Sequence, residues 1–285
     1  MGANSVLSAA GVPQISYAST SPALSDATAY PGFFRVVPSD AEQGQAMAAV
    51  ATADGMDNIA VVHMTNDYGA GLADAFVSNM DASHICTQLG YAEDTSDFAS
   101  AVEAVSNAGC TSVFLVSYAA DGAMILEEMA TQGVNIPVYG GDGIAEEGLA
   151  AGMADASIVD GVIASKPSAG GSMSEVQMVF AALCGAHPDC AGGIYTAEAF
   201  DAITMMALSA FTYLTTPGLD AGMAVMAVGQ GWDGASGTLS FMANGDVPSS
   251  GFCIGEFSHD SADGSVSYDC VRQWDIINGI TTNSA

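Results

Sequence analysis

Basic residues are almost absent from this sequence. Its 285 residues include 3 Lys and Arg against 32 Asp and Glu, which gives a formal net charge of −29. Nucleic acid and anionic membrane surfaces repel such a chain, so neither is expected as a partner. A high net charge is typical of disorder only when hydrophobicity is low, and here 50% of the residues are hydrophobic. The composition predicts a folded protein with an acidic, solvated shell, which would suit a saline environment with an acidic proteome.

Long apolar runs are also absent. No run approaches the roughly 20 residues of a membrane span, so we expect no insertion into a membrane. The first residues, MGANSVLSAAGVPQ, lack a basic segment followed by a long apolar core, so no signal peptide is expected within this chain.

The signatures of several enzyme classes are missing. Neither a G-x-S-x-G nucleophile elbow nor a G-x-x-x-x-G-K-[ST] phosphate loop occurs, and GGDGIAEEG (140–148) lacks dinucleotide spacing. His63 falls inside an apolar strand, where the expected role is that of a hydrogen-bonded core residue. The four histidines are scattered along the chain: His63, His84, His187 and His259. We therefore expect no catalytic residues, no cofactor and no enzymatic activity.

The six cysteines fall into three pairs of near neighbours. Six cysteines allow many connectivities, of which this pairing is the simplest. The stretch CGAHPDC (184–190) contains a His and could be a metal site, but its spacing fits no common zinc pattern. We expect a disulfide there, no metal, and an oxidising compartment outside the cytosol. The candidate disulfides join Cys86 to Cys110, Cys184 to Cys190, and Cys253 to Cys270.

Short apolar runs alternate with helical patterns along most of the chain. Continuous apolar runs separated by helices indicate an α/β fold with a parallel sheet that helices cover on both faces. The tail from residue 237 changes to strands joined by Asn-Gly and Asp-Gly turns, which predicts hairpins. Strands are expected over 12–15, 58–65, 111–118, 136–142 and 160–167, and helices over 66–81, 119–133 and 196–214.

Polar side chains stand just past the carboxyl ends of the expected strands, where doubly wound sheets bind ligands. Hydroxyls and backbone N–H groups in the first loop would suit a carboxylate. A fixed negative charge would suit an ammonium group, and tyrosines offer apolar faces with a polar tip. Each residue alone is compatible with ordinary turn and capping chemistry, but together they indicate a site for a small zwitterion. The residues are Ala18, Ser19, Thr20, Tyr68, Tyr118 and Asp142.

Four longer stretches are similar to one known family. They are GVPQISYASTSPALSD (11–26), FFRVVPSDAEQGQAMA (33–48), NDYGAGLADAF (66–76) and SYAADGAMILEEMATQGVNIPVYGGDGI (117–144). Together they resemble the type I periplasmic substrate-binding proteins of ABC transporters, in the branched-chain amino acid (Leu/Ile/Val-binding) group. The resemblance covers nearly all of the chain.

This resemblance implies two α/β lobes, each a mostly parallel sheet flanked by helices, joined by three crossovers and closing on a ligand. Lobe one would comprise 1–37 plus 167–245, and lobe two 38–166 plus 246–285. The resemblance also implies the roles of the site residues. The backbone of Ala18 would meet the ligand ammonium, and Thr20 would bind the carboxylate with Ser19 adjacent. From the second lobe, Tyr68 and Tyr118 would close over the ligand, and Asp142, where the family often has Glu, would pair with the ammonium.

The function implied is that of an extracytoplasmic solute-binding component of an ABC transporter. It would bind a small amino acid of the branched-chain type between its lobes, as a monomer in the periplasm or at the cell surface, and deliver it to a membrane permease. Polar amino acids, short amides and urea stay open as ligands. The alternative is a ligand-binding sensor domain of a receptor, or an amide- or amino-acid-responsive regulator of the same fold.

The resemblance also concerns the start of the chain. Family members have further strand–helix units and a Ser-Gly-x-Ser/Thr loop before the position that corresponds to Met1. We therefore expect lobe one to be incomplete and truncated at the N-terminus, with an exposed sheet edge. Ligand binding by residues 1–285 alone is expected to be weak or absent.

Overall fold

The computed structural model describes residues 2–168, 173–187, 190 and 193–282. The chain divides into two compact units, one of Met1–Ser39 with Pro167–Ser250 and the other of Asp40–Lys166 with Gly251–Ala285. We call them unit 1 and unit 2 and describe each by itself. The lobe boundaries expected at 37, 167 and 245 lie close to these divisions. Residues 1 and 283–285, at the ends of the expected ranges, lie outside the described residues.

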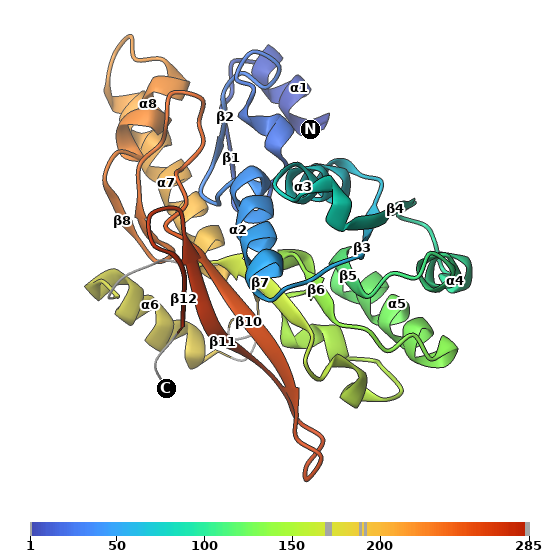
Figure 1. The fold of residues 1–285 in the computed structure, drawn as a ribbon. Coiled ribbons are helices and arrows are strands. Elements are labelled where there is room, and N and C mark those ends of the chain that lie inside the picture. The colour runs from blue at the N-terminus through green and yellow to red at the C-terminus, as the bar shows by residue number, and fades with distance from the viewer. Residues whose placement is uncertain (1, 169–172, 188–189, 191–192, 283–285) are drawn as a thin grey trace. The chain divides into compact units, whose positions relative to one another are not determined.

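Unit 2 is built on an eight-stranded sheet with the strand order β12-β11-β10-β7-β6-β5-β3-β4 (Figure 1). The strands from β4 to β7 pair in parallel, which confirms the expected α/β class with a mostly parallel sheet. Every residue of β3 and β5 is buried, as expected for strands covered on both faces. The bounds are β3 (Ile59–Met64), β4 (Ile85–Tyr91), β5 (Ser112–Val116), β6 (Val138–Gly140) and β7 (Ile163–Pro167).

Helices cover both faces of this sheet. Successive side chains of a strand point to opposite faces. Accordingly Ile59 and Val61 pack in one apolar cluster with α2 and α3, whereas Ala60 and Val62 pack in another with α4 and α5. The helices are α2 (Asp40–Ala53), α3 (Asp67–Ser78), α4 (Ala99–Asn107) and α5 (Ala119–Gln132). Short 3₁₀ helices are η2 (Ala82–His84), η3 (Asp142–Ile144), η4 (Glu147–Ala150) and η5 (Ala156–Val159).

Local sequence signals fix the ends of the two helices nearest the expected site. The side chain of Asn66 accepts the backbone N–H of Gly69 at 2.8 Å and caps α3. Gly133 ends α5 with a φ of 70°, the left-handed conformation that favours glycine. α3 therefore begins just after β3, and α5 ends at Gly133, in agreement with the predicted helix ranges.

The tail of the chain forms antiparallel hairpins, also as predicted. β10 (Phe252–His259) pairs with β11 (Val266–Asp275), and β11 pairs with β12 (Gly279–Thr282). The Asp263–Gly264 pair lies in the first turn and Asn278–Gly279 in the second, with positive φ at both glycines.

Within its described residues, unit 1 has two small sheets of two strands each. Parallel pairing there is limited to β1 (Gln14–Ser16) and β2 (Phe33–Arg35), while β8 (Trp232–Gly234) and β9 (Gly237–Leu239) form an antiparallel hairpin. An apolar cluster that includes Ile15, Phe34 and Met205 joins these strands to the helices. The helices are α1 (Gly2–Ala9), η1 (Pro22–Ser25), α6 (Glu175–Gly185), α7 (Thr196–Thr215) and α8 (Ala221–Val228).

A buried acid on α7 holds the β8–β9 hairpin. Asp201 is 0% exposed and accepts hydrogen bonds from the indole of Trp232, the backbone N–H of Ala235, and the N–H and hydroxyl of Ser236. A buried carboxylate needs this many donors, because burial without them is costly. The hairpin is therefore fixed to α7 by a polar anchor in addition to apolar packing.

One predicted turn is present but does not join two strands. The sequence predicts that Asn244–Gly245 joins two strands of a hairpin, but this pair forms a turn outside any strand, closed by Gly245 N–H to Met242 O and Met242 N–H to Asp246 O. Gly245 has a φ of 86°, and a Cβ there would overlap the carbonyl oxygen of Phe33. The glycine is required because this turn presses against β2.

The cysteines form the three near-neighbour disulfides that the sequence predicts: Cys86–Cys110, Cys184–Cys190 and Cys253–Cys270. Cys184 and Cys190 are thus bonded to each other, so the metal alternative for this stretch was wrong. His63 is a buried residue of β3 whose Nδ1 lies 2.8 Å from the carbonyl oxygen of Met64, as expected for a hydrogen-bonded core histidine.

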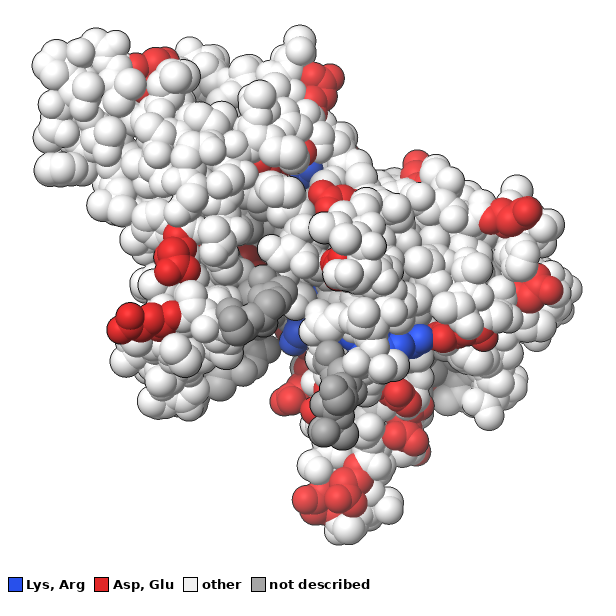
Figure 2. Space-filling view, turned by 60° about the vertical axis from the view of Figure 1, so that its left-hand side comes forward, with Lys and Arg blue, Asp and Glu red and all other residues white. Residues whose placement is uncertain are grey.

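The surface is acidic. Figure 2 shows Asp and Glu side chains spread over the face in view, with Lys and Arg visible at few places. Among the described residues, no helix has the length and apolar character needed to cross a membrane.

A cluster of charged and polar side chains links α2 to the sheet of unit 2. Both terminal nitrogens of Arg272 donate to Asp54, at 2.6 and 2.9 Å, and Tyr139 donates to the same carboxylate at 2.8 Å. Burial works to raise the pKa of Asp54, but the hydrogen bonds from Arg272 and Tyr139 outweigh it, and the pKa is lowered. The charged form of Asp54 therefore stabilises unit 2.

We predict that Asp54→Asn lowers the free energy of unfolding by about 1–2 kcal/mol at pH 7. Because the folded-state pKa is depressed, this stabilisation is complete above the unfolded value of about 4 and is lost as the pH falls through the folded value. Urea unfolding of the original protein and of Asp54→Asn between pH 7 and pH 3 measures this difference in the free energy of unfolding. Glu103→Gln, at an exposed position of α4, is the control and should change stability by less than about 0.5 kcal/mol. A difference in the free energy of unfolding between the original protein and Asp54→Asn that stays constant from pH 7 to pH 3 would contradict the prediction.

Candidate functional site

Three of the predicted site residues lie at one edge of the sheet of unit 2. Tyr68 lies in the first turn of α3, Tyr118 is the N-cap residue of α5, and Asp142 begins η3. These positions follow β3, β5 and β6, which are parallel neighbours, so their carboxyl ends share an edge. The structure thus brings together the three residues that sequence reasoning assigned to this unit.

A hydrogen bond joins two of these residues. The hydroxyl of Tyr68 donates to Oδ1 of Asp142 at 2.9 Å and accepts the backbone N–H of Gly143 at 3.0 Å. Asp142 is only 3% exposed. Its carboxyl group is therefore buried and held in one orientation by a tyrosine hydroxyl at this edge.

The second tyrosine stacks on the first. The rings of Tyr68 and Tyr118 lie 5.3 Å apart between centroids, with 9° between their planes. Tyr118 is 48% exposed, so part of its side chain remains open to solvent. The pair forms an aromatic wall beside the carboxylate, which can contact either an apolar side chain or a cation.

Glycines make this close arrangement possible. A Cβ on Gly143 would overlap the carbonyl oxygen of Ser117 and lie 2.9 Å from the Tyr68 hydroxyl. A Cβ on Gly141 would overlap the side chain of Leu72 and lie 3.1 Å from the same hydroxyl. Gly141 and Gly143, two of the three glycines of the GGDG stretch (140–143), are therefore needed for the approach of η3 to α3. These two glycines serve packing at the site, and no local pattern in the sequence marks them for that role.

The electrostatic environment of the edge is negative. Burial, followed by the negative charges of Asp142 and Asp40, raises the pKa of Tyr68 well above its ordinary value, so its hydroxyl stays a neutral donor. Burial and then Asp142 also raise the pKa of Tyr118. Burial and the nearby Glu93 raise the pKa of Asp121. A group with a positive charge would be stabilised here.

Two basic side chains are described in unit 2, Arg272 and Lys166. Arg272 is bonded to Asp54, and the ammonium of Lys166 lies 4.8 Å from the centre of the Tyr268 ring.

The other predicted site residues lie in unit 1, in the loop after β1. The hydroxyl of Ser16 accepts the N–H groups of Ala18 and Ser19, at 3.4 and 3.0 Å. Thr20 is 4% exposed. The carbonyl oxygens of Ser19 and Thr20 accept hydrogen bonds from the guanidinium of Arg35, at 3.3 and 2.7 Å. This loop therefore has a defined backbone conformation.

Sequence reasoning missed Arg35. It appears in FFRVVPSD as one charge within an apolar run, and the structure makes it fully buried and bonds it to Asp246 at 2.7 Å. A signal was present, because a charge inside an apolar strand must find a partner. The partner itself could not be identified from the sequence.

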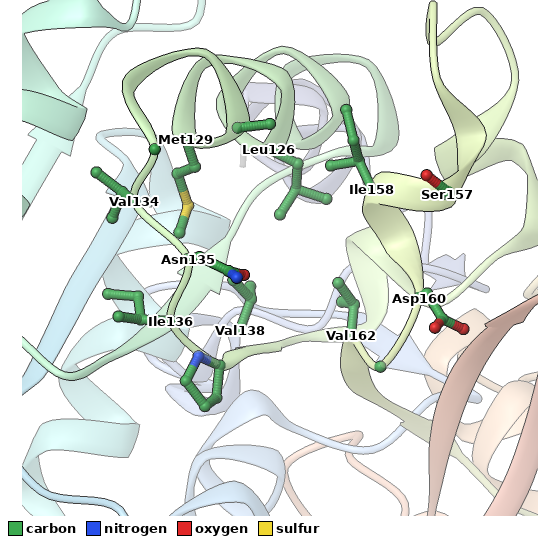
Figure 3. A pocket seen from close by; sticks show the side chains of 14 residues that line it. Leu126, Met129, Val134, Asn135, Ile136, Val138, Ser157, Ile158, Asp160 and Val162 are labelled. Carbon is green, nitrogen blue, oxygen red and sulfur yellow. The ribbon is translucent and has the colours of Figure 1, made fainter.

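A pocket elsewhere in unit 2 does not coincide with the predicted residues. It has a volume of about 700 Å³ and lies at the amino ends of β6 and β7, with Leu126, Met129, Val138 and Val162 among the lining residues (Figure 3). Ligands of doubly wound sheets bind at the carboxyl ends of the strands. The candidate site is therefore the edge formed by Tyr68, Tyr118 and Asp142.

The chain belongs to the family described as the receptor family ligand binding region, whose model matches residues 2–260. The fold is that of the type I periplasmic binding proteins, as the sequence resemblance predicts. A leucine-binding protein from Thermotoga maritima has the same fold with a TM-score of 0.78, at 18% sequence identity over 93% of this chain and 74% of that chain.

Two curated relatives show local similarity in sequence. Metabotropic glutamate receptor 6 of Rattus norvegicus is 43% identical over 82 residues, which cover 28% of this chain and 9% of the receptor. Leu/Ile/Val-binding protein homolog 3 of Brucella melitensis is 32% identical over 143 residues, which cover 49% of this chain and 38% of that protein. The matches thus span less than half the length of either relative. By their names, these relatives are a receptor and a binding protein.

We predict that Gly143→Ala destabilises the protein by about 1–3 kcal/mol, because the added methyl group meets a backbone oxygen that cannot move aside freely. It should also displace the Tyr68 hydroxyl from Asp142. Thermal unfolding measures the first effect, and the chemical shifts of the Tyr68 ring measure the second. Gly148→Ala is the matched control, since the nearest atom to a Cβ there is a side-chain carbon at 3.6 Å. Equal stability of the two variants would contradict the prediction.

Proposed function

We propose that this protein is the extracytoplasmic solute-binding component of an ABC transporter and that it binds a small amino acid of the branched-chain type. The observation that carries the proposal is the carboxylate of Asp142, buried, oriented by Tyr68 and flanked by the stacked Tyr118. Membership of a ligand-binding family and the fold of leucine-binding proteins support it.

The chemistry of the edge favours an ammonium group as its ligand. A carboxylate fixed at low exposure gives a short, charge-assisted hydrogen bond to an N–H donor. The stacked tyrosines offer an apolar surface for an aliphatic side chain next to that charge. As the sequence resemblance implies, we assign the ligand carboxylate to Thr20, with Ser19 adjacent, and a contact with the ammonium to the backbone of Ala18.

The role that we propose includes no covalent change to the ligand. The relatives are named as binding proteins and receptors, and a binding role needs only the hydrogen bonds, charge and apolar surface described for the edge. Delivery to a membrane permease is the corresponding partner interaction. Three disulfides favour a location outside the cytosol, in the periplasm or at the cell surface.

A second candidate is a sensor domain of a receptor. The local identity of 43% to a metabotropic glutamate receptor favours it, because this match is closer over its 82 residues than the match to the Leu/Ile/Val-binding homolog. Ligand recognition at the Asp142 edge would be shared by both roles. Co-purification of the protein with permease subunits or with a signalling partner distinguishes them.

We predict that Asp142→Asn weakens binding of L-leucine by about 2 kcal/mol, or about 30-fold in Kd, because the ammonium loses its charged partner. The measurement is an NMR titration that follows the backbone amide of Gly143. Recovery of unchanged leucine afterwards tests the absence of turnover.

The control is Asp269→Asn, which makes the same change of charge on β11. It should leave the affinity within about twofold of the original protein. If Asp142→Asn binds leucine as tightly as this control does, the ammonium is not held by Asp142. If no amino acid shifts the Gly143 amide of the unsubstituted protein, the proposed function is wrong.

A further inference from the structure

Arg35 is the most extensively bonded cation in the described part of the chain. It is 0% exposed and its guanidinium makes five hydrogen bonds within unit 1. Nε donates to Asp246 at 2.7 Å, and one terminal nitrogen donates to the hydroxyl of Ser25 at 2.8 Å. The other terminal nitrogen donates to three successive backbone carbonyls, those of Ser19, Thr20 and Ser21, at 3.3, 2.7 and 3.0 Å.

Three carbonyls that converge on one nitrogen determine the direction of their peptide groups. The structure describes no cis peptide bond, and in a planar trans peptide the N–H points opposite to the C=O. The N–H groups of Thr20 and Ser21 belong to the peptides whose carbonyls face Arg35. They therefore point away from the guanidinium, while the third peptide ends at Pro22 and has no N–H.

The rest of the loop supports the same orientation. The N–H groups of Ala18 and Ser19 are used within the loop, by the hydroxyl of Ser16. Thr20 and Ser21 thus supply two adjacent N–H groups that point away from Arg35. Adjacent backbone N–H groups directed to one side form a concave site for an anion. A cation bonded to the opposite side of the same peptides polarises them and strengthens these donors.

Asp246, which accepts the Nε–H of Arg35, is itself held in place. Asn244 donates to the other carboxylate oxygen of Asp246 at 2.9 Å and to the carbonyl of Ser25 at 3.1 Å. The backbone N–H of Arg35 donates to Gly245 at 3.0 Å. Asn244 therefore orients Asp246, and Asp246 orients the guanidinium of Arg35. Arg35 in turn orients the loop of residues 19–21.

We propose that Arg35 is a positioning residue that holds the loop of residues 19–21 in a carboxylate-binding conformation, with the N–H groups of Thr20 and Ser21 as donors. Arg35 itself does not contact the ligand. The inference deepens the proposed function, because it explains how unit 1 would receive the carboxylate of an amino acid. It adds two backbone donors to the side chains predicted from the sequence.

The test uses Arg35→Lys, because an ammonium keeps the positive charge but cannot span the contacts that a planar guanidinium makes. Arg272→Lys is the matched control, since it makes the same change at the Arg–Asp pair of unit 2. Two measurements are made on each protein by NMR. One is the hydrogen exchange of the Thr20 and Ser21 amides, and the other is their shift during titration with acetate, which is a carboxylate without an ammonium group.

In the unsubstituted protein and in Arg272→Lys, we expect acetate to shift both amides. In Arg35→Lys, we expect that shift to be lost and exchange of the loop amides to rise about tenfold or more, with the β8–β9 hairpin of the same unit unchanged. A purely structural role would raise exchange throughout unit 1, so equal acceleration in the hairpin would overturn the proposal. Unshifted amides in the unsubstituted protein would overturn it as well.

Should Arg35→Lys fail to fold, Ser25→Ala removes one guanidinium contact and should raise loop exchange about two- to fivefold. No change in that variant would contradict the proposal. The acetate result separates this inference from the proposed function. If acetate shifts the loop amides but no amino acid shifts Gly143, the carboxylate-binding loop stands and the amino acid assignment fails.

Discussion

Parallel pairing of β3, β5 and β6 is the constraint on which the candidate site depends. It places the carboxyl ends of three strands at one edge, so the residues that follow each strand become neighbours although they are distant in the sequence. The hydrogen bond from Tyr68 to Asp142 connects residues 74 positions apart. It forms because α3 and η3 both begin at that edge, and because Gly141 and Gly143 let the two segments approach each other.

Basic residues are scarce, and each of the three makes a specific contact within the fold. Arg35 orients a loop in unit 1, Arg272 joins β11 to Asp54, and Lys166 lies over an aromatic ring. The acidic side chains far outnumber them and form a solvated surface. At the edge of unit 2, the same excess of acid gives a field that favours an ammonium group over an anion.

The sequence predicted the elements that local patterns define. The buried runs of β3 and β5 and the end of α5 at Gly133 follow from residue types within a few positions of each other. The trio of Tyr68, Tyr118 and Asp142 followed from the rule for strand ends. The bond between Arg35 and Asp246 could not be predicted, because it joins residues 211 positions apart and no local pattern links them. The turn at Asn244–Gly245 was misread for the same reason, since its role is set by β2 and not by flanking strands.

The most direct test is a comparison of two ligands that differ only at the group Asp142 should recognise. L-Leucine and 4-methyl-2-oxopentanoate share the carboxylate and the aliphatic side chain, but the second has a keto oxygen in place of the ammonium. With the backbone amide of Gly143 as the reporter in an NMR titration, we expect leucine to shift the signal and the keto acid to leave it in place. Equal shifts with both compounds would contradict recognition of an ammonium group by the Asp142 edge.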